Sequence, residues 1–368
     1  MDIGILTYYG VHNHGALLQA YALKSVLENM GHKVRFLSFE RSYEYISSKQ
    51  VQKYKISLKS IPFFLKYTKE KGIGNIIYNL KKRKALNNFR KEQFDIGTEW
   101  NEFNGDLIII GSDEVFSLEI GYNPMLYGHG LNSKATISYA ASFGPTIFED
   151  LSKKGKKEEI LRGLNSFSAV SVRDKNSQEI VEALCEKEVP MVCDPVILYG
   201  YQKELEKIKS NEEEYILIYS YDSRMNDTEE VNQIIKYARK YKMKIYSVGF
   251  FHKWCNRNIN ADPIELLGWV KNAKLVITDT FHGAVMSIIG NTPLVVKLRD
   301  NSNKLEYLLK EYGLDYRIIN KFEELEKVAA TEIDFIDVNI HISKKRAESM
   351  NYLETAIFKD KGIYNDRY

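Results

Sequence analysis

The chain has 368 residues, of which 44% are hydrophobic and 27% charged, and its formal net charge is +3. This composition is typical of a globular protein with room for two domains, and no run approaches the roughly 18 consecutive apolar residues that span a membrane. The three cysteines form no CxxC pair, and the first ten residues lack the basic region of a signal peptide, so we expect a cytoplasmic protein without a structural zinc site.

The first part of the chain alternates between short apolar strands and amphipathic helices. Strands are predicted at residues 2–8 and 33–39, and between them residues 16–30 carry apolar side chains every three or four positions until Gly31 ends the helix. This pattern is a βαβ unit. Further strands are predicted at 106–116, 135–144 and 169–174, followed by a helix at 176–186.

A basic segment interrupts this alternation. Between Lys49 and Glu92, eleven lysines and two arginines stand against two glutamates, so the segment carries +11 and the remainder of the chain −8. Apolar residues alternate with these cations, which predicts short helices with the two kinds on opposite faces. Such a surface can rest on anionic lipid headgroups, and the alternative is a solvated lysine-rich insertion. No nucleic-acid-binding pattern accompanies the segment, so we expect no nucleic acid partner.

The alternation restarts after a linker rich in lysine and glutamate. Strands are predicted at 215–221, 244–250, 274–279 and 293–299, with helices at 229–241 and 263–273 and another beginning near Gly283. Residues 342–358 read as a terminal helix. The two alternating halves predict an α/β fold with two Rossmann-like domains, at 1–196 and 197–340, and a C-terminal helix at 341–368.

Ligands of such folds bind beyond the carboxyl ends of the strands, which draws attention to the loop after the first strand. This loop contains Gly10 and Gly15, but it lacks the Lys and Ser/Thr of a Walker loop, and the chain has no GxGxxG with a downstream acid. Asn13 and His14 are candidates for ligand contact at a helix N-terminus, or they are simple loop and capping residues. His12 and His14 have no third ligand nearby, so no metal site is expected.

A second candidate position is His282, which follows the strand at 274–279 in the stretch VITDTFHGAV. A histidine beside the positive N-terminus of a helix suits an anionic substrate next to a titratable group, and the alternative is a histidine that caps the helix. Arg173, at another predicted strand end, is the cationic counterpart, because a guanidinium holds a carboxylate or phosphate with two parallel hydrogen bonds. The alternative for Arg173 is an ion pair with Asp174 or with another acid at the domain interface.

Six segments of the chain carry a resemblance to a known family: NHGALLQAYALKSVLENMGHKV, IIIGSDEVF, SYAASFG, SVRD, CDPV and PIELLGWVKNAKLVITDTFHGAVMSIIGNTPLVV. In this order and spacing they resemble the polysaccharide pyruvyl transferase family, from Gly4 to about Arg317. The resemblance implies that the domains face each other across a cleft, as in the GT-B fold, with acceptor site in the first domain and donor site in the second. It implies transfer of the enolpyruvyl group of phosphoenolpyruvate, a co-substrate, to two sugar hydroxyls of a bacterial surface polysaccharide precursor. The product is a pyruvate ketal, and no cofactor is needed.

The resemblance also assigns roles on the donor side. His282 corresponds to the general acid/base, and Arg173 to a ligand of the phosphate or carboxylate of the donor. The backbone around Phe281 and Gly283 would contribute hydrogen-bond donors from the helix N-terminus.

Thr280 departs from the family pattern. Better-understood branches carry an arginine at this position, two residues before the histidine, so one donor-binding charge is missing here. Two interpretations remain open: Lys297, Arg299 or Lys304, at the end of the next strand or beyond it, replaces this charge, or the threonine marks a branch with a different acceptor or donor.

On the acceptor side, the resemblance places Asn13, His14, Ser112 and Asp113 at the cleft, and Asp194 in a structural turn between the domains. Two alternatives remain open: a glycosyltransferase that uses a nucleotide sugar, and a noncatalytic glycan-assembly protein. The partners expected are a sugar acceptor, nucleotide-linked or lipid-linked, and an anionic membrane surface contacted by residues 49–92. This predicts a cytoplasmic protein, peripheral on the inner face of the membrane.

Overall fold

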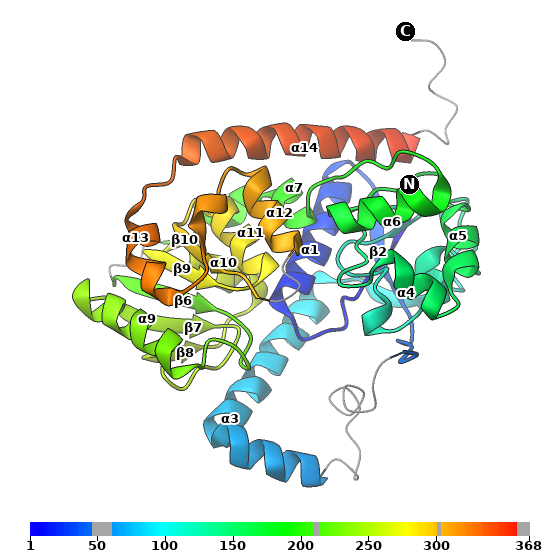
Figure 1. The fold of residues 1–368 in the computed structure, drawn as a ribbon. Helices are drawn as coiled ribbons and strands as arrows, with labels where there is room; N and C mark the ends of the chain where they lie inside the picture. Colours follow the sequence, from blue (N-terminus) through cyan, green and yellow to red (C-terminus); the bar gives the residue numbers. More distant parts are fainter. Residues whose placement is uncertain (46–60, 210–212, 300–302, 359–368) are drawn as a thin grey trace.

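The computed structural model describes residues 1–45, 61–209, 213–299 and 303–358, and for 61–71 it describes the backbone alone. It contains two parallel sheets with helices packed on their faces (Figure 1). The N-terminal sheet consists of β1 (Asp2–Leu6), β2 (Lys33–Ser38), β3 (Ile96–Glu99), β4 (Leu107–Ile110) and β5 (Ala135–Ser138). The C-terminal sheet consists of β6 (Tyr215–Tyr219), β7 (Lys244–Val248), β8 (Arg257–Ile259), β9 (Leu275–Thr278), β10 (Leu294–Lys297) and β11 (Ile318–Ile319).

Both sheets have a point where the strand order reverses. The N-terminal order is β3-β2-β1-β4-β5 and the C-terminal order is β11-β10-β9-β6-β7-β8, with parallel pairing at β1/β4 and β6/β9. Crossovers leave the sheet in opposite directions on the two sides of such a point and open a crevice at the carboxyl ends of the strands. The predicted α/β fold with two Rossmann-like domains and a C-terminal helix is confirmed, and each domain offers one crevice.

The helices cover both sheets. They are α1 (His14–Asn29), α3 (Ile61–Gln93), α4 (Phe148–Lys153), α5 (Lys157–Leu164), α6 (Lys175–Cys185), α7 (Pro195–Tyr199), α8 (Gln202–Glu206), α9 (Thr228–Lys240), α10 (Pro263–Lys271), α11 (Phe281–Ile289), α12 (Asn303–Glu311), α13 (Leu325–Ala330) and α14 (Phe335–Phe358). Short 3-10 turns lie at Leu118–Ile120, Pro124–Tyr127, Asp315–Arg317 and Phe322–Glu324. In the described part of the chain, no helix is both long enough and apolar enough to cross a membrane.

The strand predicted at 169–174 is present only as isolated bridges: Ala169 pairs with Ile137 of β5, and Val172 pairs with Ala141, beyond the end of β5. Serine hydroxyls add to the backbone hydrogen bonds there: Ser138 Oγ donates to Ser171 O over 2.9 Å, and Ser171 Oγ donates to Ser138 O over 3.0 Å. Serine side chains can satisfy backbone groups in this way without a continuous strand.

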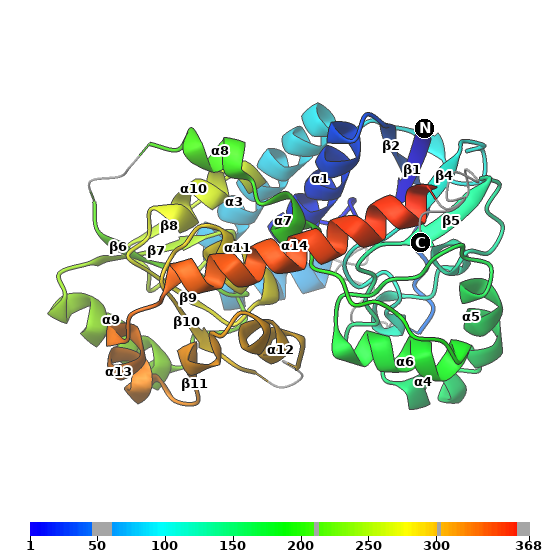
Figure 2. The same ribbon diagram turned by 90° about the horizontal axis from the view of Figure 1, so that it is seen from above.

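Two helices join the halves of the molecule. Helix α1 of the N-terminal domain packs against α7 and α10, and Tyr201 Oη, just after α7, donates to Leu18 O over 2.6 Å. Helix α14 runs across both domains (Figure 2). Its Tyr352 Oη donates to Ser138 O in the N-terminal domain over 2.8 Å, and its Lys345 pairs with Glu311 of the C-terminal domain at 3.0 Å. Helix α14 begins at Phe335 instead of residue 341, and residues 359–368 of the predicted helix lie outside the described residues.

The basic segment forms one long helix, α3, with a break in helical backbone at Gly72 (φ 80°). The part of the prediction that falls on 49–60, and on the side chains of 61–71, lies outside the described residues. After Gly72, the helix buries Tyr78, Lys82 and Leu86 against the body. The prediction that apolar and cationic residues lie on opposite faces of short helices is wrong for this helix. Lys82 is 7% exposed with Nζ 4.4 Å from the centre of the Phe250 ring, whereas Ile73 and Leu80 are exposed. Burial lowers the pKa of Lys82 to about 8.

Candidate active site

His282 lies in the first turn of α11, beside the reversal point of the C-terminal sheet. The hydroxyl of Thr280 caps this helix by accepting a hydrogen bond from Gly283 N over 3.0 Å. A Cβ atom on Gly283 would lie 2.1 Å from Thr278 Oγ1, so glycine allows the helix to start directly against the strand. The helix therefore begins at Phe281, two residues before the predicted start, and the side chain of Thr280, not of His282, provides the cap.

The imidazole of His282 meets the N-terminus of α1 in the other domain. A Cβ atom on Gly15 would lie 2.3 Å from both Cγ and Nδ1 of His282, which is closer than any real Cβ contact. Asn13 caps α1, since its Oδ1 accepts from Gly15 N over 2.9 Å. Gly15, after the loop that follows β1, and His282, after β9, are therefore in contact, and the carboxyl ends of the two sheets meet at the His282 ring.

Arg173 occupies the centre of this interface and is 6% exposed. Its Nη1 donates to Asp194 Oδ2 over 2.7 Å, and its Nη2 donates to Asp113 Oδ1 over 3.0 Å. The guanidinium carbon lies 4.5 Å from the centre of the Phe281 ring, a cation–π contact. Burial acts to raise the pKa of Asp113, but the charges of Arg173, His282 and Lys304 outweigh it and hold this pKa at about 2. Arg173 therefore pairs with two interface acids, and not with Asp174.

Asp194 links Arg173 to His282. It is the N-cap of α7, where its Oδ1 accepts from Val196 N over 2.9 Å, and its other oxygen lies 3.7 Å from His282 Nε2. Within the described residues, His282 Nε2 is buried and makes no hydrogen bond. Burial lowers the pKa of His282, while the carboxylates of Asp194 and Asp113 act against that shift. A histidine in such a setting is a candidate for proton transfer.

Lys304 completes the cluster from α12. Its Nζ pairs with Glu114, in the loop after β4, and lies 5.9 Å from the centre of the Phe281 ring. The cluster contains three carboxylates and two cations besides the histidine: Asp113, Glu114, Asp194, Arg173 and Lys304. Its net charge is therefore −1 when His282 is neutral and zero when His282 is protonated. The cavity lined by Arg173, Asp194, Phe281 and Lys304 measures about 10 Å³, room for about one water molecule.

The predicted acceptor residues lie in the N-terminal crevice, but two of them are turned into the protein. His14 is buried, with Nε2 2.9 Å from Ala261 O of the other domain, and burial together with the charge of Lys82 lowers its pKa to about 3. Ser112 is also buried, and its backbone N–H donates to Gln19 Oε1 over 3.2 Å. Of the four acceptor candidates, Asp113 is the one that takes part in the ion pairs around His282.

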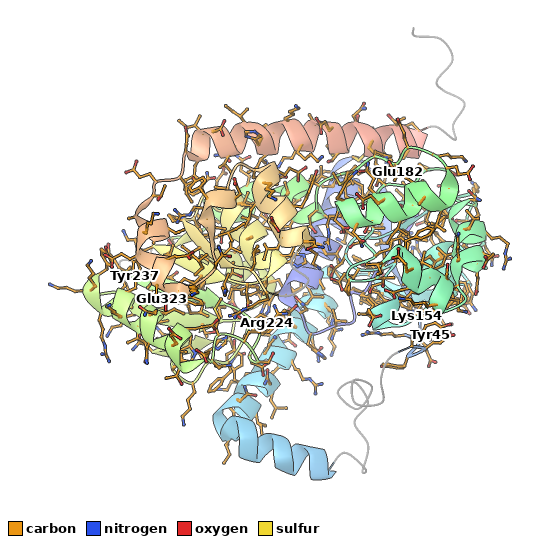
Figure 3. All side chains as sticks on the ribbon, in the orientation of Figure 1. Tyr45, Lys154, Glu182, Arg224, Tyr237 and Glu323 are labelled. Atoms are coloured by element: carbon orange, nitrogen blue, oxygen red, sulfur yellow. The ribbon has the colours of Figure 1, made fainter. Side chains whose placement is uncertain are left out.

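Two of the predicted donor cations have other partners. The guanidinium of Arg299 holds both oxygens of Glu230, at 2.6 and 3.0 Å, and also donates to Asp279 over 3.2 Å. Arg224, labelled in Figure 3, lies with its Nη1 3.9 Å from Oδ1 of Asp279, whereas Arg299 donates to the other oxygen, Oδ2. Lys297 Nζ donates to Asn320 O. Of the three cations named to replace the missing arginine, Lys304 joins the His282 cluster.

Sequence reasoning missed two members of the cluster. Asp194 was expected to be a structural turn residue, and it is both a helix cap and the shared partner of Arg173 and His282. Glu114 carried no signal beyond its position next to Asp113. The short apolar run at 189–193, directly before Asp194, was the one feature that could have indicated a strand end there.

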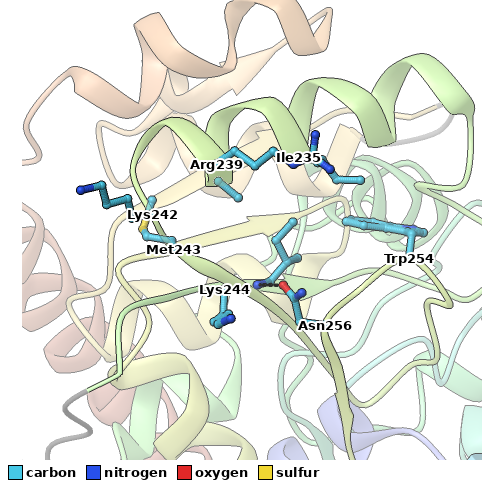
Figure 4. Close-up of a pocket in the computed structure, with 9 residues that line it drawn as sticks. Ile235, Arg239, Lys242, Met243, Lys244, Trp254 and Asn256 are labelled. Atoms are coloured by element: carbon cyan, nitrogen blue, oxygen red, sulfur yellow. Dashed lines mark hydrogen bonds between the residues drawn. The ribbon is translucent and has the colours of Figure 1, made fainter.

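A larger hollow, of about 400 Å³, lies elsewhere (Figure 4). It is lined by α9 and by the start of β7, including Arg239, Lys242 and Lys244, with Trp254 at one side. Its Asn256 Oδ1 already accepts from Ile245 N over 2.8 Å. Because Lys244 is the first residue of β7, this hollow lies at the amino ends of the strands, opposite the edge that holds His282. It is therefore separate from the candidate active site.

Comparison with known proteins agrees with this arrangement. A family model described as polysaccharide pyruvyl transferase matches residues 13–301. Among solved structures, the chain is similar to the UDP-GlcNAc 2-epimerase from Methanocaldococcus jannaschii, at 12% identity and a TM-score of 0.50, covering 91% of this chain and 93% of that one.

Two further structures are similar over almost the full length. The UDP-N-acetylglucosamine 2-epimerase from Rickettsia bellii has 12% identity and a TM-score of 0.50, with 99% of this chain and 98% of that chain covered. The UDP co-structure of MnaA from S. aureus has 10% identity and a TM-score of 0.52, with 100% and 98% covered. At such identities the likeness shows a shared two-domain fold and nothing about chemistry. A search of curated proteins found no match.

Proposed function

This chain belongs to the polysaccharide pyruvyl transferase family, and we propose that it transfers the enolpyruvyl group of phosphoenolpyruvate to two hydroxyls of a sugar. One observation carries the proposal: His282 Nε2 lies 3.7 Å from Asp194 Oδ2 at the junction of the two crevices and has no hydrogen bond within the described residues. A proton-transfer group placed between the two substrate-binding edges is what this reaction requires.

The reaction needs one proton at carbon and the loss of two from oxygen. Protonation at C3 of phosphoenolpyruvate makes a methyl group and leaves an oxocarbenium-like centre at C2, where the first sugar hydroxyl adds. The C2–O bond to phosphate then breaks, and the second hydroxyl adds at C2 to close the ketal. Of the two hydroxyl protons released, one balances the proton in the new methyl group and the other leaves with phosphate. A single acid/base group can serve both transfers.

His282 is our candidate for that group. Burial lowers the pKa of His282 and favours the neutral imidazole, which can act as a base toward a sugar hydroxyl. The carboxylates of Asp194 and Asp113 act in the opposite direction and favour the imidazolium, which can act as the acid toward C3. An anionic donor adds negative charge beside the ring and favours the protonated form further. Asp194 would keep the imidazolium oriented, as carboxylates do for catalytic histidines.

Arg173 and Lys304 are our candidates for holding the donor. In the structure both are engaged by carboxylates, and the cavity beside them holds about 10 Å³, so a donor must displace one of these acids. Asp113 is the easier to displace, because its side chain is 22% exposed and that of Asp194 is 0% exposed. We propose that the donor carboxylate or phosphate takes the place of Asp113 on Arg173, and that Asp113 then turns toward the acceptor.

The other candidate residues have secondary roles in this proposal. The backbone N–H of Phe281 would add a donor at the positive end of α11. The N–H of Gly283, which was also predicted to be a donor, is already bonded to the Thr280 hydroxyl, and this cap would hold the helix end in place. The acceptor would enter beside Asn13, and we propose a sugar of a surface polysaccharide precursor in the cytoplasm.

The test is a thermal unfolding experiment with phosphoenolpyruvate and, separately, with UDP-sugars, because a ligand that binds the native state raises the melting temperature. We expect a rise with phosphoenolpyruvate alone. Phosphate release in the presence of pooled sugar acceptors, followed by phosphorus NMR, tests the transfer itself. A rise with a UDP-sugar and none with phosphoenolpyruvate would reject the proposed donor.

A further inference from the structure

Helix α3 has two faces after the break at Gly72, and the inner one packs on both domains. Its buried residues are spaced three or four apart: Asn75, Tyr78, Lys82, Leu86 and Phe89. Tyr78 Oη donates to Ile259 O over 2.9 Å, and the cluster that contains Leu86 and Phe89 also contains the core of the N-terminal domain. This packing fixes which side of the helix faces outward.

The outer face carries large apolar side chains in water. Ile73 is 68% exposed, Ile77 49% and Leu80 60%. Their spacing of four and then three residues places them in one stripe, opposite the buried residues. Figure 1 shows this end of α3 projecting below the body of the molecule, away from α14. The stripe therefore faces outward, on the side of α3 opposite the residues that pack on both domains.

Cations extend and flank this stripe. Lys84 and Lys91 continue it along the same side of the helix, and Lys81 and Arg83 stand on its two borders, all four with exposed side chains. From Lys71 to Lys91 the sequence contains no aspartate or glutamate. An exposed apolar stripe with basic borders is the pattern of a helix that lies in the interface of an anionic membrane.

The same charges argue against a second copy of the chain as the occupant. A two-fold contact through this stripe would place the same four cations of each copy against one another, since a two-fold interface pairs one patch with itself. Like charges at such distances repel, whereas anionic headgroups attract them.

We propose that the outer face of α3, formed by Ile73, Ile77, Leu80, Lys81, Arg83, Lys84 and Lys91, binds the surface of an anionic lipid membrane. The apolar side chains enter the headgroup boundary and the cations hold the lipid charge. Lys82, which faces the protein, takes no part. This inference is independent of the proposed donor, and it would place the enzyme where lipid-linked glycans are modified.

The test is cosedimentation of the full chain with vesicles of phosphatidylglycerol and phosphatidylcholine, compared with phosphatidylcholine alone. We expect binding to the anionic vesicles and its loss at high salt, because salt screens exposed charges. Two triple variants test the two parts of the face: Lys81→Gln/Arg83→Gln/Lys84→Gln and Ile73→Gln/Ile77→Gln/Leu80→Gln. Each should partition at least about 10-fold less to the anionic vesicles.

Each variant has a matched control of the same chemistry on another face. Lys236→Gln/Lys327→Gln/Lys344→Gln removes three exposed cations from α9, α13 and α14. Ile147→Gln/Ile336→Gln/Ile340→Gln removes three isoleucines that are 46%, 77% and 61% exposed. Both controls should bind vesicles as the original chain does, and unchanged melting temperatures in all four would show that folding is intact.

Three results would overturn the proposal. The first is equal sedimentation with neutral and anionic vesicles, and the second is no sedimentation with either at low salt. The third is a loss of vesicle binding in the control variants equal to the loss in the test variants. Light scattering adds a fourth: a dimer that the Ile73/Ile77/Leu80 variant converts to a monomer would assign the face to a second copy.

Discussion

The ring of His282 lies against the backbone of Gly15, so closely that a Cβ atom on Gly15 would stand 2.3 Å from the ring. The two residues come from different domains, and their contact closes the interface on which the proposed chemistry depends. Arg173, Asp113, Asp194 and Lys304 are assembled around the same junction.

The first prediction concerns this contact. Gly15→Ala should displace His282 or open the interface, because the added methyl would overlap Cγ and Nδ1 of the His282 ring. We expect a loss of about 1 to 3 kcal/mol in the free energy of unfolding, as for other overpacked sites, and reduced turnover. Urea unfolding and an assay of phosphate release measure the two effects. The control is Gly97→Ala, where a Cβ atom would meet nothing within 4 Å. Equal stability of the two variants would contradict the close packing.

The second prediction separates catalysis from helix capping at His282. His282→Ala should lower turnover roughly 100-fold or more with little change in melting temperature, because Thr280 carries the cap. Thr280→Val should instead cost about 0.5 to 2 kcal/mol of stability. If the imidazolium is the acid, turnover of the original chain should fall as pH rises past the pKa of His282 in the complex. A His282→Ala protein that melts far lower yet keeps its specific activity would show a structural histidine.

The third prediction concerns the donor cations. Arg173→Lys should weaken phosphoenolpyruvate binding by about 1 to 3 kcal/mol, because an ammonium cannot hold two acceptors in the geometry of a guanidinium fork. Lys304→Met should weaken it as well. Lys310→Met on the same helix α12 is the control, since Lys310 is exposed and pairs with Glu306 of its own helix. Calorimetric titration that gives the same affinity for Arg173→Lys and the original chain would remove Arg173 from the donor site.

The fourth prediction concerns acid stability at His14. Burial and Lys82 lower its pKa to about 3, while an unfolded histidine titrates near 6.5. The unfolded state therefore binds the extra proton first, so the contribution of His14 is complete above about pH 6.5 and is lost as pH falls from there toward 3. His14→Gln should flatten this part of the curve, measured by urea unfolding at a series of pH values. His341→Gln, an exposed residue of α14, serves as the control. An unchanged slope for His14→Gln would show that His14 does not titrate in this way.

The sequence was sufficient for most of the alternating strands and helices that build the two sheets, and for the sheet edge at which the candidate site lies. Apolar runs such as 275–278 and 107–110 are buried on both faces, and the periodic helices between them permit little besides parallel sheets. Because ligands of such sheets bind at the carboxyl ends of the strands, His282 and Arg173 could be selected from their positions alone. The short edge strands β3, β8 and β11 were not predicted, since their residues are few and in part exposed and so leave little pattern.

The partners of each charged residue were decided only by the tertiary structure. The local sequence does not distinguish Arg299 from Lys304. In the structure, Arg299 pairs with Glu230 and Asp279, whereas Lys304 pairs with Glu114 and lies near the Phe281 ring. Lys82 is buried and its neighbour Lys81 exposed because the packing of α3 on both domains selects one side of the helix. The contact of Gly15 with His282 depends on how the two sheets pack, a long-range arrangement that backbone propensity and hydrophobic period do not encode.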